Sequence, residues 1–451
     1  MKLAVVVQRY GADINGGAEL HARYIAERLS RHGEVQVFTT CARDYVTWAN
    51  ELPPGEERVN GVRVRRFRVR HPRVPRDFAA RSERVFERIH SVHDELAWLS
   101  AEGPTSPALI SALARESKSL DFILFFSYRY YHSYYGSRAT PDKAILVPTA
   151  ERDPAIALSM FGPLFRGVRA VMYNSYEERA LIQRVTHNES VPGVVVGVGS
   201  DVPDRAVPAR FRKKFNIRAP FAIYVGRIDA NKGCGELFDY FQRYAREYPR
   251  GLSLVLVGSA VLEVPSHPRV RHLGFLSDED KFDAIAAADV LIMPSEYESL
   301  SMVALEAWGL GRPVLANGRC DVLCGQCIRS NAGLYYEGYD EFVETLFALE
   351  SNGPLNAVLG RNGREYFRRH YAWPVIERKY LDMFDRLKRE KARSRMEPLP
   401  GWFARRRASI PGAAEVLAGI PAGPVSPEGA GAPQAGGAAA HSFAGQRERQ
   451  A

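Results

Sequence analysis

One pair of cations has the residue types and spacing needed to hold an anionic group. Arg227 and Lys232 lie five positions apart in the stretch 224–233, directly after the hydrophobic run Phe221–Val225. Two cations at the carboxyl end of a strand can clamp a diphosphate, because Arg supplies directional donors and Lys supplies a point charge. Taken alone, the pair is also typical of solvated surface cations.

A pair of carboxylates follows the hydrophobic run Val290–Met293. Glu298 falls in a predicted loop, and Glu306 lies one or two turns into the next predicted helix. The backbone of 299–302 would form the N-terminus of that helix, where an anion is favoured. Carboxylates beside such a site suit hydrogen bonds to sugar and ribose hydroxyls. The alternative is that Glu298 caps the helix and Glu306 is a surface residue.

A third candidate site lies near the start of the chain, in the stretch Asn15-Gly16-Gly17-Ala18-Glu19. Glycines allow the backbone to approach a ligand closely, and the following helix N-terminus offers free N–H groups. The stretch therefore predicts a phosphate or sugar site, although an ordinary tight turn explains it equally well. It lacks the Gly-x-Gly-x-x-Gly pattern of dinucleotide-binding folds.

Hydrophobic runs alternate with helical patterns along the chain, and this order predicts two doubly wound α/β domains with a cleft at the carboxyl ends of their strands. The first series of strands is predicted at Leu3–Val7, Val35–Thr39, Phe122–Phe126, Ala144–Val147, Ala170–Tyr173 and Val194–Val196. The second is predicted at Phe221–Val225, Leu252–Val257, Val270–Leu273, Val290–Met293, Pro313–Ala316 and Gly333–Tyr335. Later helices are predicted at about 233–248, 277–287, 301–309, 338–350, 355–369 and 374–392.

Composition places the chain among globular proteins. Its 451 residues are 46% hydrophobic and 25% charged, which excludes wholesale disorder, collagen and a disulfide scaffold. There is no run of about 20 apolar residues and no signal-peptide pattern, so we expect a cytoplasmic protein. The predicted boundaries are Rossmann-like domains at 1–200 and 221–372, a linker at 201–220, a helix at 373–396 packing back toward the N-terminal domain, and a disordered Ala-, Gly- and Pro-rich tail at 397–451.

The net charge of +9 is concentrated in two segments. Segment 58–88 holds eleven arginines against three acidic residues, and segment 386–407 holds nine cations against two. Cations beside aromatic residues suit an anionic membrane surface. Solvated surface arginines are the simpler interpretation, and no recognition motif predicts nucleic-acid binding.

Three of the five cysteines are clustered as Cys320-x3-Cys324-x2-Cys327. This spacing is typical of the iron–sulfur site in radical S-adenosylmethionine enzymes, although there it lies near the start of a barrel. A zinc site would need a fourth ligand, for which His272 and His370 are distant candidates. We expect reduced structural cysteines and no metal site.

The order and spacing of these motifs resemble the retaining glycosyltransferases of family 4, also described as glycosyl transferases group 1. That family has the GT-B fold of two facing Rossmann-like domains. The resemblance covers about 1–385 and rests on Gly226-Arg227-x4-Lys232, Val257-Gly258, His272-Leu273-Gly274-Phe275, Glu298-x7-Glu306, the run Leu305–Val314 and Gly16-Gly17-Ala18-Glu19.

The resemblance implies a role for each matching residue in binding a nucleotide-diphosphate sugar. Arg227 and Lys232 would bind the diphosphate together with the backbone of Ser299, Leu300, Ser301 and Met302. Glu306 would bind the ribose, and Glu298 would contact the donor sugar at the site of reaction. Gly274 and Phe275 would lie near the base. Gly17 would sit close to the donor phosphate. Gly16 and Gly258, which belong to the matching motifs, would also be part of the donor site. The implied reaction retains configuration and needs no metal ion or other cofactor.

Two departures from the family pattern affect the reacting region. The family often has Glu-Gly-Phe-Gly where this chain has Glu298-Ser299-Leu300-Ser301. In the stretch 147–154, Glu151 stands where the family commonly has a His that is thought to contact the donor sugar. Glu151 can accept hydrogen bonds from sugar hydroxyls, but it is not a cation near neutral pH.

The sequence therefore predicts a glycosyltransferase that moves a sugar to a glycan or lipid-linked acceptor in polysaccharide or glycolipid synthesis. The N-terminal domain would bind the acceptor and the C-terminal domain the donor, at the inner face of the membrane. The alternatives are a phosphorylase or epimerase of the same architecture, or a non-catalytic basic scaffold that retains a nucleotide pocket.

Overall fold

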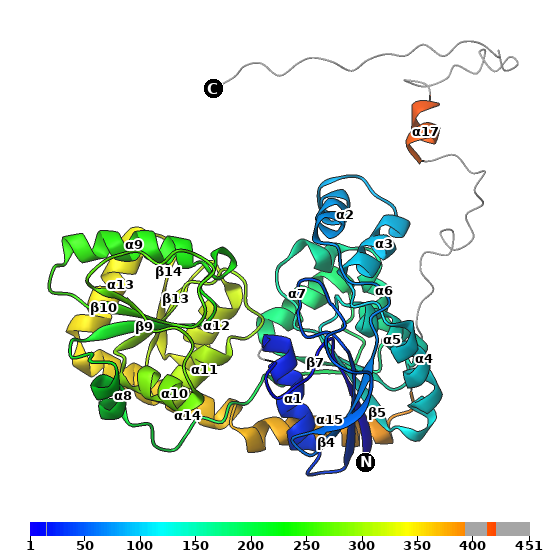
Figure 1. The fold of residues 1–451 in the computed structure, drawn as a ribbon, viewed down its shortest axis with the longest axis horizontal. Helices are drawn as coiled ribbons and strands as arrows, with labels where there is room; N and C mark the ends of the chain where they lie inside the picture. Colours follow the sequence, from blue (N-terminus) through cyan, green and yellow to red (C-terminus); the bar gives the residue numbers. More distant parts are fainter. Residues whose placement is uncertain (15, 393–412, 421–451) are drawn as a thin grey trace, which may run out of the picture. The chain divides into compact units, whose positions relative to one another are not determined.

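The computed structural model describes residues 1–14, 16–392 and 413–420 (Figure 1). The chain divides into two units, Met1–Leu399 and Pro400–Ala451, and both sheets lie in the first. In the second, the described residues include a short helix, α17 (Ala413–Ala418), where the sequence predicts no stable fold. Five of its six residues are strong helix formers, three Ala, one Glu and one Leu. Near the N-terminus, Asn15 lies outside the described residues. The rest of the predicted tail, 397–412 and 421–451, lies outside them as well.

The N-terminal domain is built on an eight-stranded sheet with the order β3-β4-β2-β1-β5-β6-β7-β8. All neighbours pair in parallel except β3 with β4, which form an antiparallel hairpin. The central strands are almost wholly buried runs of aliphatic and aromatic residues, as expected for a parallel sheet covered on both faces. The strands are β1 (Lys2–Val6), β2 (Glu34–Thr40), β3 (Gly55–Val59), β4 (Val62–Phe67), β5 (Phe122–Phe126), β6 (Ala144–Val147), β7 (Ala170–Tyr173) and β8 (Gly193–Val195).

Seven helices and a C-terminal helix accompany this sheet. The seven are α1 (Gly17–Leu29), α2 (Pro75–Glu87), α3 (Val92–Glu102), α4 (Pro107–Glu116), α5 (Tyr131–Ala139), α6 (Phe161–Gly167) and α7 (Tyr176–Thr186). The last long helix, α15 (Trp373–Arg389), comes from the other end of the chain and packs here. The ring of Phe384 stacks on Phe122 with centroids 5.3 Å apart, and Arg169 donates a hydrogen bond to the carbonyl of Leu387 at 2.8 Å.

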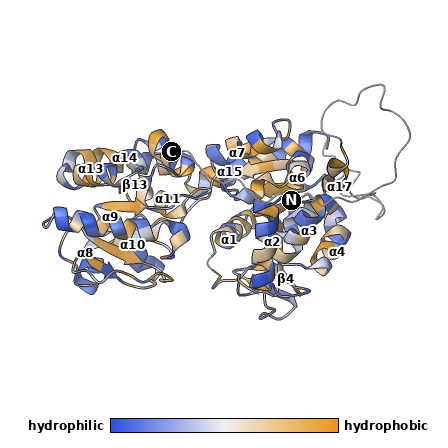
Figure 2. Cartoon of the chain, turned by 90° about the horizontal axis from the view of Figure 1, so that it is seen from above, coloured by the Kyte–Doolittle hydropathy of each residue, from blue (hydrophilic) through white to orange (hydrophobic). Residues whose placement is uncertain are grey.

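The C-terminal domain is built on a six-stranded, fully parallel sheet with the order β11-β10-β9-β12-β13-β14. Its strands are β9 (Phe221–Val225), β10 (Ser253–Val257), β11 (Val270–His272), β12 (Val290–Met293), β13 (Val314–Asn317) and β14 (Gly333–Tyr336). Its helices are α8 (Pro208–Lys214), α9 (Cys234–Glu247), α10 (Asp278–Ala287), α11 (Met302–Gly309), α12 (Asp321–Ser330), α13 (Tyr339–Ser351) and α14 (Gly353–His370). In Figure 2 hydrophobic residues follow central strands such as β13, whereas covering helices such as α8 carry hydrophilic ones.

The observed order confirms the prediction of two α/β domains with parallel sheets. Strands β5, β6, β7, β9 and β12 have the predicted bounds, because buried parallel strands appear in the sequence as short uninterrupted hydrophobic runs. The segment 201–220, predicted to be a linker, contains α8. Strand β3 and helices α2 to α7 were not predicted.

The arginine-rich segment 58–88 spans β4 and α2, and most of its charge is neutralised within the fold. Seven of its eleven arginines form ion pairs, several with carboxylates from outside the segment: Arg63 and Arg65 with Glu56, Arg65 with Glu116, Arg66 with Glu57, Arg73 with Glu102, Arg81 with Asp77, Arg84 with Asp94, and Arg88 with Glu83. The expectation that this segment presents an open cationic surface is therefore weakened. Of the other basic segment, 393–407 lies outside the described residues. Among described helices, none is long and apolar enough to cross a bilayer.

Candidate active site

Arg227 stands at the carboxyl end of β9, after a glycine that ends the strand. Gly226 has a φ of 155° and donates its N–H to the carbonyl of Val257 at 2.9 Å. The Arg227 guanidinium pairs with the carboxylate of Asp229 and donates to the hydroxyl of Tyr45 at 3.3 Å. Arg227 is thereby held between an acidic partner of its own domain and an aromatic residue of the N-terminal domain.

Lys232 is positioned by a tight turn that depends on glycine. Asp229 caps the turn by accepting a hydrogen bond from the Lys232 N–H at 2.9 Å. Gly233 follows with a φ of 70°, and a Cβ there would lie 2.2 Å from the carbonyl oxygen of Pro294, so no larger residue fits. The Lys232 ammonium lies 2.7 Å from Glu298 Oε1. Burial disfavours its charge, but this carboxylate outweighs burial and raises the pKa of Lys232.

The loop after β12 brings Glu298 and the N-terminus of α11 to the same place. Ser301 caps α11 and takes a left-handed backbone with a φ of 69°, which non-glycine residues adopt rarely. Its hydroxyl accepts a hydrogen bond from the N–H of Ala304 at 3.4 Å. The free N–H groups and positive dipole end of α11 therefore lie beside Lys232 and Glu298, as an anion site requires.

On the N-terminal side, α1 begins directly at the double-glycine loop. Gly16 is the N-cap, and a Cβ added there would overlap the Glu19 side chain. A Cβ at Gly17 would meet nothing within 4 Å, so the space in front of it is open. Arg9 pairs with Glu19 at 2.6 Å and donates to the carbonyl of Arg43 at 2.7 Å. The loop thus presents bare backbone beside a cation that already has partners.

These groups line one cavity of about 490 Å³. Nine of the thirteen predicted site residues lie on its wall: Gly16, Gly17, Glu151, Arg227, Lys232, Glu298, Ser299, Leu300 and Ser301. The cavity receives side chains from the carboxyl ends of strands in both sheets, which is where open α/β sheets bind ligands. Residues more than 280 positions apart are therefore brought to one site.

Glu151 lies where a carboxylate is difficult to ionise. Burial, followed by the neighbouring charge of Glu298, raises its pKa to about 7, and Lys232 and Arg129 only partly offset this. Behind it, buried Glu178 accepts the N–H of Ala150 at 2.6 Å and also the N–H of Asn174. Burial raises the pKa of Glu178 to about 8. A carboxyl with a pKa near 7 can be present in both protonation states at neutral pH.

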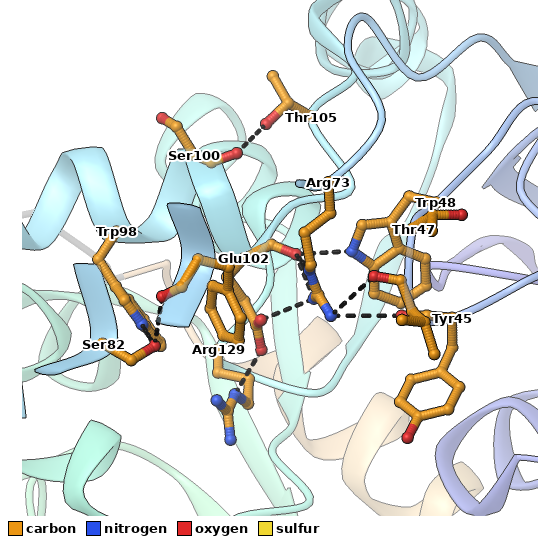
Figure 3. Close-up of polar contacts among 12 residues, drawn as sticks. Tyr45, Thr47, Trp48, Arg73, Ser82, Trp98, Ser100, Glu102, Thr105 and Arg129 are labelled. Atoms are coloured by element: carbon orange, nitrogen blue, oxygen red, sulfur yellow. Dashed lines mark hydrogen bonds and ion pairs between the residues drawn. The ribbon is translucent and has the colours of Figure 1, made fainter. Parts of the chain in front are cut away.

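A chain of four alternating charges supports the N-terminal wall, and Figure 3 labels three of them, Arg73, Glu102 and Arg129. The Glu102 carboxylate is buried and accepts from Arg73 at 2.7 Å, and its other oxygen lies 2.8 Å from Arg129 Nε. Arg129 continues to Asp153, with Nη1 and Oδ2 2.7 Å apart. Arg129 and Asp153 line the cavity, whereas Glu102 and Arg73 stand behind it. These four charges on the wall therefore neutralise one another in ion pairs.

Four predicted site residues lie away from the cavity wall. Glu306 is only 4% exposed, and its Oε1 accepts from Ser200 at 3.0 Å and Lys281 at 3.1 Å, while its Oε2 has no hydrogen-bond partner. Gly258 donates its N–H to the carbonyl of Gly274 at 2.8 Å, and Phe275 is 76% exposed. Gly258, Gly274 and Phe275 lie beyond the carboxyl ends of β10 and β11, and Glu306 lies within α11, so the structure does not bring the four to the same wall as Lys232.

The cysteine cluster lies at the start of α12 and along it. Among the residues that the structure describes, no three His, Cys, Asp or Glu side chains are placed to hold a metal ion together. Burial raises the pKa of Cys320 and Cys327 to about 12. Without a bound metal ion, both thiols are therefore protonated near neutral pH.

The structure also adds cavity residues that were not predicted from the sequence. Gln8, Ser127, Thr149 and Asn174 each come shortly after a strand, β1, β5, β6 and β7 respectively, and these four strands are neighbours in the sheet. A polar residue at the end of each buried run was the available signal. Each of these residues, taken alone, is indistinguishable from an ordinary polar loop residue.

Comparison with known proteins shows a similarity to glycosyltransferases. Residues 219–351 match the family model described as Glycosyl transferases group 1. A D-inositol 3-phosphate glycosyltransferase of Corynebacterium urealyticum is 23% identical over 410 residues, which cover 84% of this chain and 92% of that relative.

Solved structures of other proteins share the fold. The sucrose-phosphate synthase of Thermosynechococcus elongatus has a TM-score of 0.64 at 19% identity, over 86% of this chain and 99% of that one. HepE of Anabaena, solved in complex with UDP-glucose, has a TM-score of 0.60 at 15% identity, over 86% of this chain and 100% of that one. Two Rossmann-like domains with a cavity at their strand ends define the GT-B type. The chain is a glycosyltransferase of this type, and the matches confirm its resemblance to family 4.

Proposed function

We propose that the protein transfers a sugar from a nucleotide-diphosphate sugar to a hydroxyl of a glycan or lipid-linked acceptor, with retention of configuration. Its place would be the cytoplasmic face of the membrane, in polysaccharide or glycolipid synthesis. The observation that carries the proposal is the convergence of Arg227, Lys232, Glu298 and the N-terminus of α11 on one cavity opposite Gly17. That combination suits a diphosphate attached to a sugar.

Arg227, Lys232 and α11 would stabilise the diphosphate as it leaves. The bond between the anomeric carbon and the diphosphate oxygen breaks, and a bond to the acceptor oxygen forms on the same face of the sugar. The hydroxyl proton of the acceptor passes to the leaving diphosphate. Fixed cations and N–H groups stabilise developing negative charge without reorganising, so the reaction needs no metal ion.

Glu298 and Glu151 would contact the donor sugar from two sides. Glu298 lies 2.7 Å from Lys232 and can accept hydrogen bonds from sugar hydroxyls. Glu151, in its protonated form, can donate a hydrogen bond as well as accept one, which a carboxylate cannot do. The ribose would bind beyond Lys232 through Glu306, whose Oε2 is a buried acceptor without a partner.

The experiment is a thermal-shift panel of UDP, GDP and their sugar conjugates, followed by turnover with and without EDTA. A ligand at 100 times its dissociation constant stabilises the folded protein by about 2.7 kcal/mol. We expect at least one nucleotide to raise the melting temperature, and we expect EDTA to leave turnover unchanged. If no nucleotide produces a shift, the proposed donor site is wrong. Loss of turnover in EDTA contradicts the metal-free mechanism alone.

A further inference from the structure

A second cavity, of about 180 Å³, adjoins the 490 Å³ cavity and shares two carboxylates with it, Glu151 and Glu298. The wall of this side pocket comes from both domains. The loop after β6 and helix α7 line it from the N-terminal domain, and the loop after β12 and the start of α12 line it from the C-terminal domain. A substituent of a sugar bound beside Glu298 would therefore face the side pocket as well.

Acidic residues dominate the lining of the side pocket. Six carboxyl groups face two guanidinium groups, namely Glu151, Glu177, Glu178, Glu296, Glu298 and Asp321 against Arg152 and Arg319. Four of the six have a cationic partner: Glu177 with Arg329, Glu296 with Arg319, Glu298 with Lys232, and Asp321 with Arg152. A fifth, Glu178, is buried and accepts the backbone N–H groups of Ala150 and Asn174. Five of the six are therefore satisfied without a ligand.

Glu151 is the exception among these carboxyl groups. Within the described part of the chain its side chain forms no ion pair and no hydrogen bond, although it is partly exposed and lines both cavities. Burial and the charges of Glu298 and Asp153 raise its pKa, and Lys232 and Arg129 offset this only in part. The group that Glu151 lacks is therefore a positive charge close to its oxygens.

A positive charge suits this position better than a hydroxyl does. A hydroxyl supplies a hydrogen bond but leaves the repulsion between Glu151 and Glu298 in place. An ammonium group interacts favourably with both carboxylates at once, and a hydrogen bond between charged groups is about twice as strong as one between neutral groups. On a sugar ring, the compact substituent that carries a positive charge near neutral pH is a primary amine.

We propose that the protein acts on a sugar that carries a primary amino group, and that Glu151 selects this sugar by pairing with its ammonium where the two cavities meet. This proposal rests on the proposed function, since the amino sugar would be either the transferred donor sugar beside Glu298 or the acceptor. Glu298 would keep its 2.7 Å pair with Lys232 and add a second negative charge near the ammonium. Glu151 is thereby a specificity-determining residue of the transfer reaction.

The backbone beside Glu151 is held in place before any ligand binds. The N–H of Ala150 donates to the buried carboxyl of Glu178 at 2.6 Å, and the other oxygen of Glu178 accepts the N–H of Asn174. The loops that follow β6 and β7 are thus tied to α7 through one side chain. Glu151 therefore needs little reordering to meet an ammonium, which lowers the entropic cost of binding.

The test compares amino sugars with their hydroxyl counterparts by calorimetric titration at pH 7. D-glucosamine, 3-amino-3-deoxy-D-glucose and 6-amino-6-deoxy-D-glucose are each compared with D-glucose, alone and in the presence of UDP or GDP, and UDP-glucosamine is compared with UDP-glucose. N-acetyl-D-glucosamine, whose nitrogen is uncharged, controls for size. The variant Glu151→Gln keeps the shape of the side chain and removes its charge. Glu296→Gln is the matched control, because Glu296 lines the same pocket but its partner Arg319 also pairs with Glu236 at 2.6 Å.

We expect at least one amino sugar to bind at least ten-fold more tightly than its hydroxyl counterpart and than N-acetyl-D-glucosamine. This preference should disappear in Glu151→Gln and remain in Glu296→Gln. A preference for UDP-glucosamine over UDP-glucose would identify the donor as the amino sugar. A preference for a free amino sugar in the presence of UDP or GDP would identify the acceptor.

The proposal is overturned if no amine is preferred, if the preference survives in Glu151→Gln, or if Glu296→Gln abolishes it equally. Failure of both UDP and GDP to bind would instead count against the proposed donor site. The free amino sugars titrated without nucleotide would then still decide whether Glu151 selects an ammonium.

Discussion

The two halves of the cavity use charged residues in opposite ways. On the C-terminal half, Arg227 and Lys232 each have one acidic partner, and their side chains remain 42% and 34% exposed beside the positive end of α11. On the N-terminal half, Arg129 lies between two carboxylates, Glu102 and Asp153. The C-terminal half therefore keeps its cations within reach of a ligand, whereas in the N-terminal half the Arg129 cation is neutralised by carboxylates of the same wall.

This difference indicates which part of a substrate each half can bind. Exposed cations at strand ends favour a diphosphate, and a single carboxylate partner can be displaced by it. A wall whose charges are mutually neutralised favours neutral groups such as hydroxyls. Substitutions in one half of the cavity can therefore be judged against the other half as the reference.

The largest expected effect is on stability, in the N-terminal half. Glu102→Ala removes the buried carboxylate between Arg73 and Arg129 and leaves both guanidinium groups without that partner. Breaking a buried pair in this way costs about 3–5 kcal/mol of unfolding free energy. Denaturant unfolding of the purified variant measures it.

The matched control for this change is Glu56→Ala, which removes an exposed carboxylate from Arg63 and Arg65 on the same sheet. Exposed pairs contribute little, so its unfolding free energy should stay close to that of the unaltered protein. Equal losses in the two variants would mean that the wall does not depend on its buried charges.

The next effect is on transfer, in the C-terminal half. Arg227→Ala and Lys232→Ala should each lower the rate of nucleoside diphosphate release by about 100- to 1,000-fold, because each removes a group that stabilises the leaving diphosphate. Release is measured with the nucleotide sugar that gives the largest thermal shift. Lys214→Ala, which breaks a 2.7 Å pair with Asp280 outside the cavity, should leave the rate unchanged. Losses below ten-fold in both cavity variants would show that these cations do not serve the reaction.

A smaller effect concerns pH, where the two halves meet. The pKa of Glu151 is raised from 4.5 to about 7 by burial and Glu298, so the folded protein binds this proton more tightly than the unfolded chain does. The contribution of the Glu151 proton to the free energy of unfolding is fully present below pH 4.5 and is lost as the pH rises to about 7. Four other charged groups also face Glu151, namely Lys232, Arg129, Asp153 and Glu178. These groups are the same in the unaltered protein and in the variant Glu151→Gln.

Glu151→Gln removes the ionisation and keeps the shape. Between pH 5 and pH 8.5, the unaltered protein should lose on the order of 2 kcal/mol of unfolding free energy relative to this variant. Denaturant unfolding across that range gives the difference directly. A difference that stays constant with pH would mean that Glu151 ionises as an ordinary exposed carboxylate.

The smallest effect concerns the outer limit of the donor half. Phe275 is 76% exposed and was predicted to lie near the base. Phe275→Ala should leave the melting temperature unchanged, because little packing is lost. If the base stacks on this ring, nucleotide affinity falls by about two- to ten-fold. An affinity equal to that of the unaltered protein would place the base elsewhere.

The C-terminal half of the cavity could be predicted from the sequence because its signals are local. Arg227, Lys232, Glu298 and the N-terminus of α11 each follow a hydrophobic run that is unmistakably a buried strand, and their spacing matches a known family. Parallel strands end at one edge of a sheet, so residues after β9 and β12 had to meet.

The N-terminal half of the cavity could not be predicted in this way, because its residues are linked only by topology. Gln8 and Asn174 lie 166 positions apart, and the strands β5 and β6 stand between their strands in the sheet. The arginine-rich segment shows the same limit. Its net charge suggested an exposed basic surface, but Glu102 and Glu116 come from helices α3 and α4, which were not predicted.

Calorimetric titration of UDP and GDP into three proteins tests the division of the cavity most directly: the unaltered protein, Lys232→Ala and Asn174→Leu. We predict that one nucleotide binds per chain, that its affinity falls at least ten-fold in Lys232→Ala, and that Asn174→Leu binds it as the unaltered protein does. If neither nucleotide binds, or if Asn174→Leu weakens binding as much as Lys232→Ala, the assignment of donor and acceptor to separate halves is contradicted.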